Sequence, residues 1–419
     1  MTPKLTTLKN GLRIVSDFIP HVETVSLGVW IGVGSRHETL EVNGIGHFLE
    51  HMAFKGTHKR TALQIAEEIE NVGGYLNAYT GRENTAYYAR ILKKDVSLSI
   101  DVLSDILQHS IFDSVEFHKE QFVILQEIGQ AHDTPDDIVF DCFQETCYPD
   151  QPMGWPILGY SKIIESLTPQ IVKDYMIRHY CPQRMVFSAA GNIEHEFLVE
   201  QVERCFSSFE KKEPVTIQPA LYKGGEYRQL KDLEQVHLVL GFKGFSYHHE
   251  DYYTLSVLST LLGSGMSSRL FQEVREKRGL VYTIYSSVES YLDDGKILIY
   301  AGTSEQDVKK LMPVICEQLR ELPQTLTIEE INRAKTQLKA SLLMGMESTS
   351  HRCERLANQI LIYGQPLSMH TIIQLIDGVT LEDLSRVSLS VFKSSPTFAA
   401  LGPIKEVLSY TDLCTHLHS

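Results

Sequence analysis

Two histidines and a glutamate at helical spacing form the strongest chemical signal in the sequence. The segment His47-Phe48-Leu49-Glu50-His51 directly follows Gly46, where a helix is predicted to begin. Residues i and i+4 share a helix face, so both imidazoles can reach one metal ion, with Glu50 on the same side. This spacing is typical of a zinc clamp with an adjacent base. The alternative is a solvated helix face that carries two histidines.

A catalytic zinc site needs a third protein ligand and keeps one position open. The predicted helix 114–130 offers Glu120 and Glu127, which lie seven residues apart on one face among apolar positions. Carboxylates near a core face need a partner, and zinc would be one. Without the histidine pair, two solvated glutamates on an amphipathic helix would be the better interpretation.

The elements that must position these residues follow from hydrophobic periodicity and turn residues. A glycine-rich turn at Gly32 and Gly34 separates the first strand from the helix that begins near residues 44–46, and Gly73-Gly74 ends the next helix. We expect a strand over 24–33, a helix over 61–72, a hairpin of strands 75–80 and 85–92, and helices over 96–110 and 114–130.

The second half of the chain resembles the first. Val236–Phe242 parallels residues 25–31, and Asp307-Val308 lies 212 residues after Asp95-Val96. We infer an internal duplication, with a linker at 213–228 between a zinc-binding domain, 1–212, and a second domain, 229–419. Coincidence between two α+β segments is the alternative. Residues 258–262, which correspond to the histidine motif, contain no metal ligands, so we expect one zinc ion per chain.

Composition excludes several classes of protein. Hydrophobic residues make up 43% and charged residues 22%, which are values of an ordinary globular chain. The net charge of −14 argues against nucleic acid or an anionic membrane as the main partner. Between residues 101 and 150, Lys119 stands alone against twelve acidic residues, which favours basic binding partners. Seven cysteines without a CxxC pair, and no apparent signal or membrane segment, predict a cytoplasmic protein.

Taken together, these residues resemble the pitrilysin-type zinc metallopeptidases, peptidase family M16, in the branch of the processing peptidases. In that family a glutamate ligand follows the second histidine of HxxEH by 76 residues, and another essential glutamate lies seven residues before it; Glu127 and Glu120 match these positions. The resemblance covers nearly the whole chain. It includes the segments 73–78, 154–159 and 267–271, and the pair Arg275 and Tyr282.

The resemblance implies a fold of two homologous α+β domains, each an antiparallel-rich sheet with helices on one face, which enclose a chamber. It also implies an activity, that of a zinc-dependent endopeptidase acting on peptides or unfolded segments bound in extended form. A self-sufficient homodimer is preferred over a non-catalytic or heterodimer-dependent scaffold subunit, because the zinc motif and the Arg275–Tyr282 pair are both present.

The resemblance further assigns roles to individual residues. Zinc is held by His47, His51 and Glu127, and Glu50 takes a proton from the water that zinc activates. Glu120 orients His51. Asn77 and Ala78 lie on an edge strand that pairs with the substrate backbone, and Arg275 and Tyr282 of the second domain hold the carbonyl oxygen that becomes negative.

Some of these residues and others have ordinary interpretations. Without the family, Arg275 would be read as part of a charged helix end and Tyr282 as the start of a strand. The segment His248-His249-Glu250 is interpreted as an exposed loop, and Gly263-Ser264-Gly265 lacks the spacing and the lysine of a phosphate loop. Cys142 and Cys147 are interpreted as buried or idle thiols.

Overall fold

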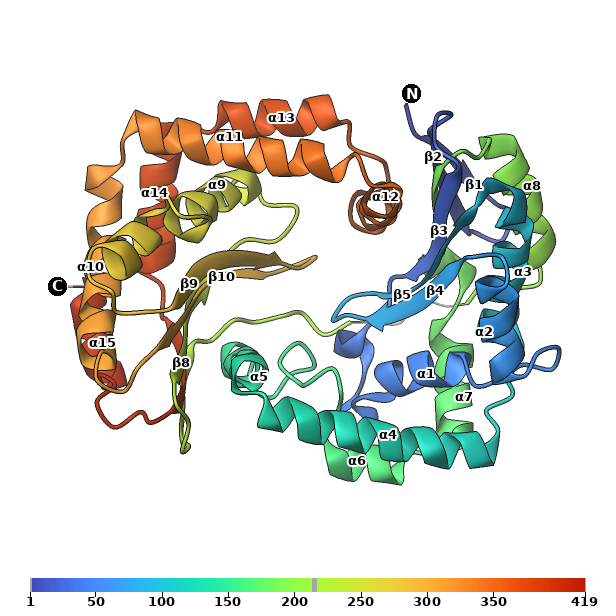
Figure 1. Cartoon of the computed structure of the whole chain (residues 1–419), viewed down its shortest axis with the longest axis horizontal. Coiled ribbons are helices and arrows are strands. Elements are labelled where there is room, and N and C mark those ends of the chain that lie inside the picture. The colour runs from blue at the N-terminus through green and yellow to red at the C-terminus, as the bar shows by residue number, and fades with distance from the viewer. Residues whose placement is uncertain (1, 213–216, 419) are drawn as a thin grey trace. The chain divides into compact units, whose positions relative to one another are not determined.

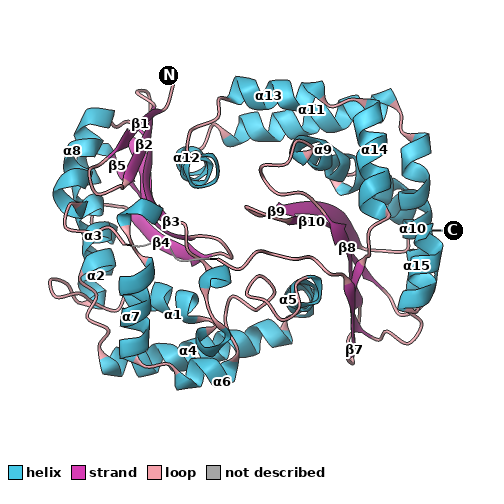
Figure 2. Cartoon of the chain, turned by 180° about the vertical axis from the view of Figure 1, so that it is seen from behind, coloured by secondary structure: helices cyan, strands magenta, loops and turns pink. Residues whose placement is uncertain are grey.

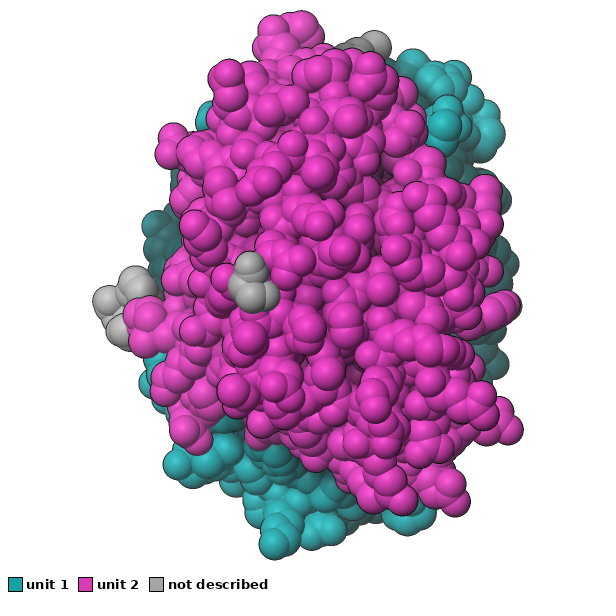
Figure 3. Space-filling model, turned by 90° about the vertical axis from the view of Figure 1, so that its left-hand side faces the viewer, with its two compact units in different colours: residues 1–129, 155–218, 343–368 teal, residues 130–154, 219–342, 369–419 magenta. Residues whose placement is uncertain are grey.

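A computed structural model of the chain describes residues 2–212 and 217–418. Its helices and strands (Figures 1 and 2) group into two compact units, each made of three separate segments of the sequence (Figure 3). Unit 1 comprises residues 1–129, 155–218 and 343–368, and unit 2 comprises residues 130–154, 219–342 and 369–419. Each unit combines a sheet with helices, as the α+β prediction requires.

The units do not follow the simple division at residues 213–228. Each takes one segment from the other half of the sequence, because a helix in that segment packs on its sheet. Within the predicted linker, residues 213–216 lie outside the described part of the chain, and residues 225–228 belong to strand β7 (Gly225–Leu230).

Unit 1 is built on a six-stranded sheet in the order β1-β2-β6-β3-β5-β4. β2 and β6 run parallel, and the other neighbouring strands run antiparallel. β4 is last in the strand order and therefore forms one edge of the sheet. The strands are β1 (Lys4–Thr7), β2 (Arg13–Phe18), β3 (Thr24–Ile31), β4 (Tyr75–Thr80), β5 (Thr85–Leu92) and β6 (Met185–Gly191).

Most helices of unit 1 pack on one face of this sheet. Side chains alternate along a strand, so Val29 and Tyr87 face these helices while their neighbours Trp30 and Ala86 face the opposite side. Thr61 begins one of the helices with a capping box to Gln64. The helices are α1 (Ile45–Ala53), α2 (Ala62–Glu70), α3 (Val96–Gln108), α4 (Ser114–Asp133), α6 (Ser161–Ser166), α7 (Pro169–His179) and α8 (His195–Phe206).

The opposite face of the sheet is covered by α12 (Thr349–Tyr363), which comes from the second half of the chain. Leu356 and Ile360 pack there against Trp30 and Val186. Three side chains of the sheet donate hydrogen bonds to this helix. Ser188 Oγ donates to the Cys353 carbonyl (2.7 Å), Arg13 Nη1 to the Ile360 carbonyl (3.1 Å) and Tyr79 Oη to Glu354 Oε1 (3.0 Å). The prediction placed helices on one face of the sheet only. The structure adds a helix on the opposite face, and no local sequence pattern indicates that this helix packs there.

Unit 2 repeats the strand topology of unit 1. Its sheet has the order β7-β11-β8-β10-β9, with β7 and β11 parallel and the rest antiparallel. This matches β2-β6-β3-β5-β4, and Asp95 and Asp307 occupy the same position before α3 and α10. The shared strand order agrees with the predicted duplication. The further strands are β8 (Val236–Lys243), β9 (Thr283–Ser290), β10 (Gly295–Thr303) and β11 (Thr397–Gly402).

One face of the second sheet is covered by α5 (Pro135–Cys147), which precedes it in sequence by many residues. Phe143 packs there beside the buried Lys296, whose ammonium lies 5.1 Å from the ring centroid and 3.1 Å from Glu289. The other helices of unit 2 are α9 (Tyr252–Gly263), α10 (Val308–Thr325), α11 (Ile328–Gly345), α13 (Met369–Gly378), α14 (Leu381–Phe392) and α15 (Tyr410–His418). Among the described residues no helix combines the length and apolar character needed to span a bilayer.

Two neutral histidines lie beside the start of α1 in unit 1. Burial and the charges of Arg184 and Arg36 lower the pKa of His37 to about 3, and its Nδ1 accepts a hydrogen bond from the Gly34 N–H (3.1 Å). Burial and Arg184 also lower the pKa of His179 to about 4, and its ring stacks on Tyr175 at 4.2 Å. An unfolded histidine has a pKa near 6.5, so protonation favours the unfolded chain.

We predict that acid destabilises the protein partly through His37. Its contribution to stability is complete above pH 6.5 and is lost as the pH falls from 6.5 toward 3, at up to about 1.4 kcal/mol per pH unit for one proton. Asparagine can accept the Gly34 hydrogen bond without titrating. Urea unfolding of His37→Asn at pH 7 and pH 5.5 should therefore show a smaller loss of stability than the parental chain. The exposed His118→Asn serves as control, and equal losses in all three proteins would contradict the prediction.

Candidate metal centre

Helix α1 presents its histidines on the face turned away from the core. Its apolar residues Phe48, Leu49 and Met52 are buried, which leaves His47, Glu50 and His51 half-buried on the other side. Gly44, at the N-cap, adopts a left-handed conformation (φ +91°). The predicted helix is confirmed at the predicted starting point.

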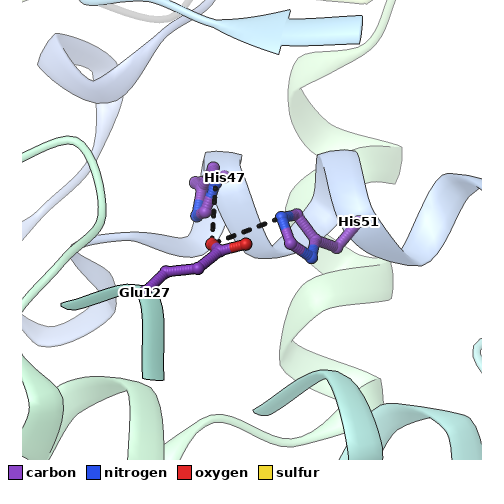
Figure 4. A group of neighbouring side chains, drawn as sticks. All are labelled: His47, His51 and Glu127. Carbon is purple, nitrogen blue, oxygen red and sulfur yellow. Dashed lines mark ion pairs between the residues drawn. The ribbon is translucent and has the colours of Figure 1, made fainter. Parts of the chain in front are cut away.

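The carboxylate of Glu127 on α4 meets both imidazoles. Its Oε2 lies 3.7 Å from His47 Nε2 and 3.6 Å from His51 Nε2 (Figure 4). One ligand atom from each of the three residues falls within 4.8 Å of the others. In a tetrahedral zinc site with bonds of about 2.1 Å, two ligand atoms are about 3.4 Å apart, so the three side chains fit a zinc ion.

The protonation of His47 suits a metal ligand. Burial and the neighbouring His51 lower the pKa of His47 to about 3. A neutral imidazole is the form that binds a metal ion. The Nδ1 atom of His47 is buried and has no hydrogen-bond partner in the described part of the chain, whereas its Nε2 faces Glu127.

Glu120 is the buried partner of His51. The residue is 6% exposed; Oε2 lies 2.9 Å from His51 Nδ1 and Oε1 lies 2.7 Å from Lys55 Nζ. A hydrogen bond at Nδ1 orients the ring and leaves Nε2 for a metal. The sequence interpretation missed Lys55, which lies two residues beyond the end of α1, so helical spacing from His51 does not place it.

Glu50 is tied to the edge strand rather than to the ligand cluster. Its Oε2 accepts a hydrogen bond from Thr80 Oγ1 (2.6 Å) on β4. Burial raises the pKa of Glu50; the Thr80 hydrogen bond and His51 lower it, and the charge of Glu127 raises it. Thr80 was also missed, because only the folding of β4 beside α1 brings it to Glu50.

Asn77 and Ala78 lie on β4, as the hairpin pattern predicts. Ala78 packs against the core on the side of α1, and its backbone N–H donates to the Asn77 Oδ1 (2.8 Å). Asn77 Nδ2 in turn donates to the exposed Tyr75 hydroxyl (2.6 Å). The N–H of Ala78 is therefore bound by the side chain of the preceding residue.

Arg275 and Tyr282 belong to unit 2. Arg275 lies in a π-helix, Phe271–Glu276, and its guanidinium stacks over the rings of Phe271 (4.8 Å) and Tyr282 (5.4 Å). Tyr282 is 75% exposed. The structure thus brings these two predicted residues together, while the other seven predicted site residues belong to unit 1.

Comparisons with known proteins agree with this arrangement. Residues 13–161 match the family model "Insulinase (Peptidase family M16)", and residues 166–338 match "Peptidase M16 inactive domain". An uncharacterized zinc protease of Rickettsia felis is 41% identical over 95% of this chain and 97% of its own length, and the uncharacterized zinc protease YmxG of Bacillus subtilis is equally similar. The crystal structure of a protease from Helicobacter pylori aligns with a TM-score of 0.89 and 25% identity, over 96% of this chain and 99% of that one.

The chain therefore belongs to the M16 family of zinc metallopeptidases. Its two-domain α+β fold is that of the family, and its group of two imidazoles and a carboxylate fits the metal that the relatives' names imply.

We predict that Glu120→Gln lowers the affinity for zinc by about ten- to hundredfold, because His51 loses the charged partner that orients it. The dissociation constant should be measured by competition with a chromogenic chelator. Glu116→Gln, one turn earlier on α4 and paired with Lys119 at the surface, should bind zinc as the parental chain does. Equal affinities in all three proteins would show that Glu120 does not support the metal site.

Proposed function

We propose that this chain is a zinc-dependent endopeptidase that cleaves peptides bound in extended form. The observation that carries the proposal is the convergence of His47, His51 and Glu127, with Glu50 held beside them by an edge-strand residue. The relatives named zinc proteases support the metal and the reaction class.

One zinc ion per chain would be held by His47 Nε2, His51 Nε2 and an oxygen of Glu127. When bound, zinc would lower the pKa of a water molecule and polarise the scissile carbonyl. His51 Nδ1–H would donate a hydrogen bond to Glu120, which leaves the lone pair of Nε2 available for the metal. Lys55 holds the Glu120 carboxylate in place through its 2.7 Å contact.

Glu50 is the proposed general base. Oε1, the oxygen that Thr80 does not bind, takes the proton of the attacking water, and the same carboxyl then gives a proton to the leaving amine, so that the peptide bond is exchanged for an acid and an amine. Its raised pKa, which burial causes, suits a group that must both accept and donate a proton. Thr80 holds Oε2 and leaves the other oxygen available.

The substrate would add as a strand to the free edge of β4. Backbone pairing at an edge gives affinity without strict sequence selection, which suits a peptidase for unfolded segments. The substrate carbonyl would replace the Asn77 Oδ1 on the N–H of Ala78. Because residues 101–150 are strongly acidic, we propose that basic peptides are preferred.

The same proposal assigns Arg275 and Tyr282 to the carbonyl oxygen that becomes negative during attack. A guanidinium and a phenol are both hydrogen-bond donors suited to an oxyanion. The stacking of Arg275 over Tyr282 supports their acting as a pair.

We predict that Glu50→Gln retains zinc but cleaves a fluorogenic peptide at least about a hundredfold more slowly, because the amide cannot accept the proton. Metal content and kcat should be measured on the same samples, with the exposed Glu67→Gln as control. A Glu50→Gln variant that holds zinc and cleaves at the parental rate would remove Glu50 from the mechanism. A parental chain that is silent with full zinc would favour the scaffold or heterodimer alternative.

We predict that Tyr282→Phe lowers kcat by about tenfold or more with little change in zinc content, since only one oxyanion donor is lost. Tyr285→Phe, three residues later on β9, keeps the parental kcat and controls for the loss of a tyrosine hydroxyl. If Tyr282→Phe turns over at the parental rate, Tyr282 has no part in the reaction.

A further inference from the structure

A buried carboxylate lies at the start of the metal-binding helix. Glu38 is 3% exposed, and its two oxygens accept three hydrogen bonds. Oε1 accepts from the Gly46 N–H (2.9 Å), and Oε2 accepts from the Gly44 N–H (2.8 Å) and from Asn43 Nδ2 (3.0 Å). Glu38 lies in neither the ligand cluster nor the set of residues that the sequence indicated.

Burial and hydrogen bonding act in opposite directions on the charge of this carboxyl group. All three neighbours are N–H donors, and the positive end of a helix stabilises an anion. Burial raises the pKa of Glu38 to about 8, although the three hydrogen bonds lower it because they favour the charged form. The start of α1, whose N–H groups have no partner within the helix, is thus held by the carboxyl oxygens of Glu38.

The backbone at Gly44 and Gly46 is closely surrounded by other atoms. A Cβ atom on Gly46 would lie 3.0 Å from Glu38 Oε1, and a Cβ atom on Gly44 would lie 2.7 Å from Gly159 Cα and from the Leu158 carbonyl oxygen. Asn43 Nδ2 also donates to the Pro156 carbonyl (3.1 Å). The turn before α1 is therefore enclosed between Glu38 and residues 156–159.

The two histidine ligands are oriented by different means. His51 is held through Nδ1 by Glu120, but His47 Nδ1 is buried without a hydrogen-bond partner in the described part of the chain. The direction of the His47 ring must therefore come from its backbone. His47 directly follows Gly46, the residue whose N–H is bound by Glu38.

We propose that Glu38 is a positioning residue of the metal centre, which orients His47 by fixing the first turn of α1. This inference rests on the proposed function, because it concerns zinc binding and the reaction that zinc supports. Glu38 touches neither metal nor substrate in this role. It supplies, through the backbone, the constraint that Glu120 supplies to His51 through the side chain.

The test compares Glu38→Gln with Glu41→Gln, an exposed glutamate of the same loop. The glutamine keeps the size of the side chain but points an NH₂ group at a backbone donor. We expect zinc affinity, measured by chelator competition, to fall about tenfold in Glu38→Gln, and kcat to fall while KM changes little. The visible absorption spectrum of the Co²⁺-substituted protein should also change, since it reports ligand geometry. Glu41→Gln should match the parental chain in all three measurements.

A second variant approaches the same contact from the helix. Gly46→Ala suits a helical backbone but presses a methyl group on Glu38 Oε1, so we expect a smaller loss of zinc affinity in the same direction. It also keeps the test open where Glu38→Gln does not fold. Folded variants with lower thermal stability but parental zinc affinity and Co²⁺ spectrum would overturn the proposal and leave Glu38 a structural cap. A parental chain that binds no zinc would instead overturn the proposed function.

Discussion

The position of one short helix controls the rest of the site. α1 has nine residues, and helices of that length are not stable alone in water, so its geometry is imposed by its neighbours. Phe48 stacks on Phe117 with ring centroids 4.4 Å apart, which joins α1 to the helix that carries Glu120 and Glu127. Beyond the C-terminal end of α1, Thr57 and Arg60 donate hydrogen bonds to the carboxylate of Asp105 on α3. The ligands therefore come from two helices clamped together, and no ligand comes from a loop.

Local patterns in the sequence predicted the elements around the site well. Strands β4 and β5 have the predicted bounds, because alternating residues flank a clear turn, and helix 114–130 needs only three more residues. The duplication was visible as a spacing of 212 residues and reappears in the strand order of both sheets. The grouping into units was not visible, because nothing in the periodicity of residues 135–147 or 349–363 shows which sheet each helix covers.

The proposed metal ligands were predicted from the spacing of residues along the sequence, whereas several side chains around them were not. His47 and His51 follow from helical geometry, and Glu127 from the family resemblance, and the structure brings all three together. Lys55, Thr80 and Glu38 were missed for different reasons. Lys55 lies beyond the end of α1, where helical spacing no longer applies, whereas Thr80 and Glu38 reach α1 only through the tertiary fold. Buried polar side chains beside a ligand-bearing helix have no signature of their own in a single sequence.

The exchanged helices α12 and α5 constrain how this protein can be made. During synthesis the sheet of unit 1 is complete at Gly191, yet the face that carries Trp30 and Val186 stays uncovered until Tyr363 has left the ribosome. The sheet on which α5 packs is completed later still, because its strand β11 ends at Gly402. Neither unit can finish folding while the chain is still growing through its middle, so the nascent chain presents apolar sheet surface of the kind that chaperones bind. A gene fragment that encodes only the metal-binding half would leave that surface permanently open.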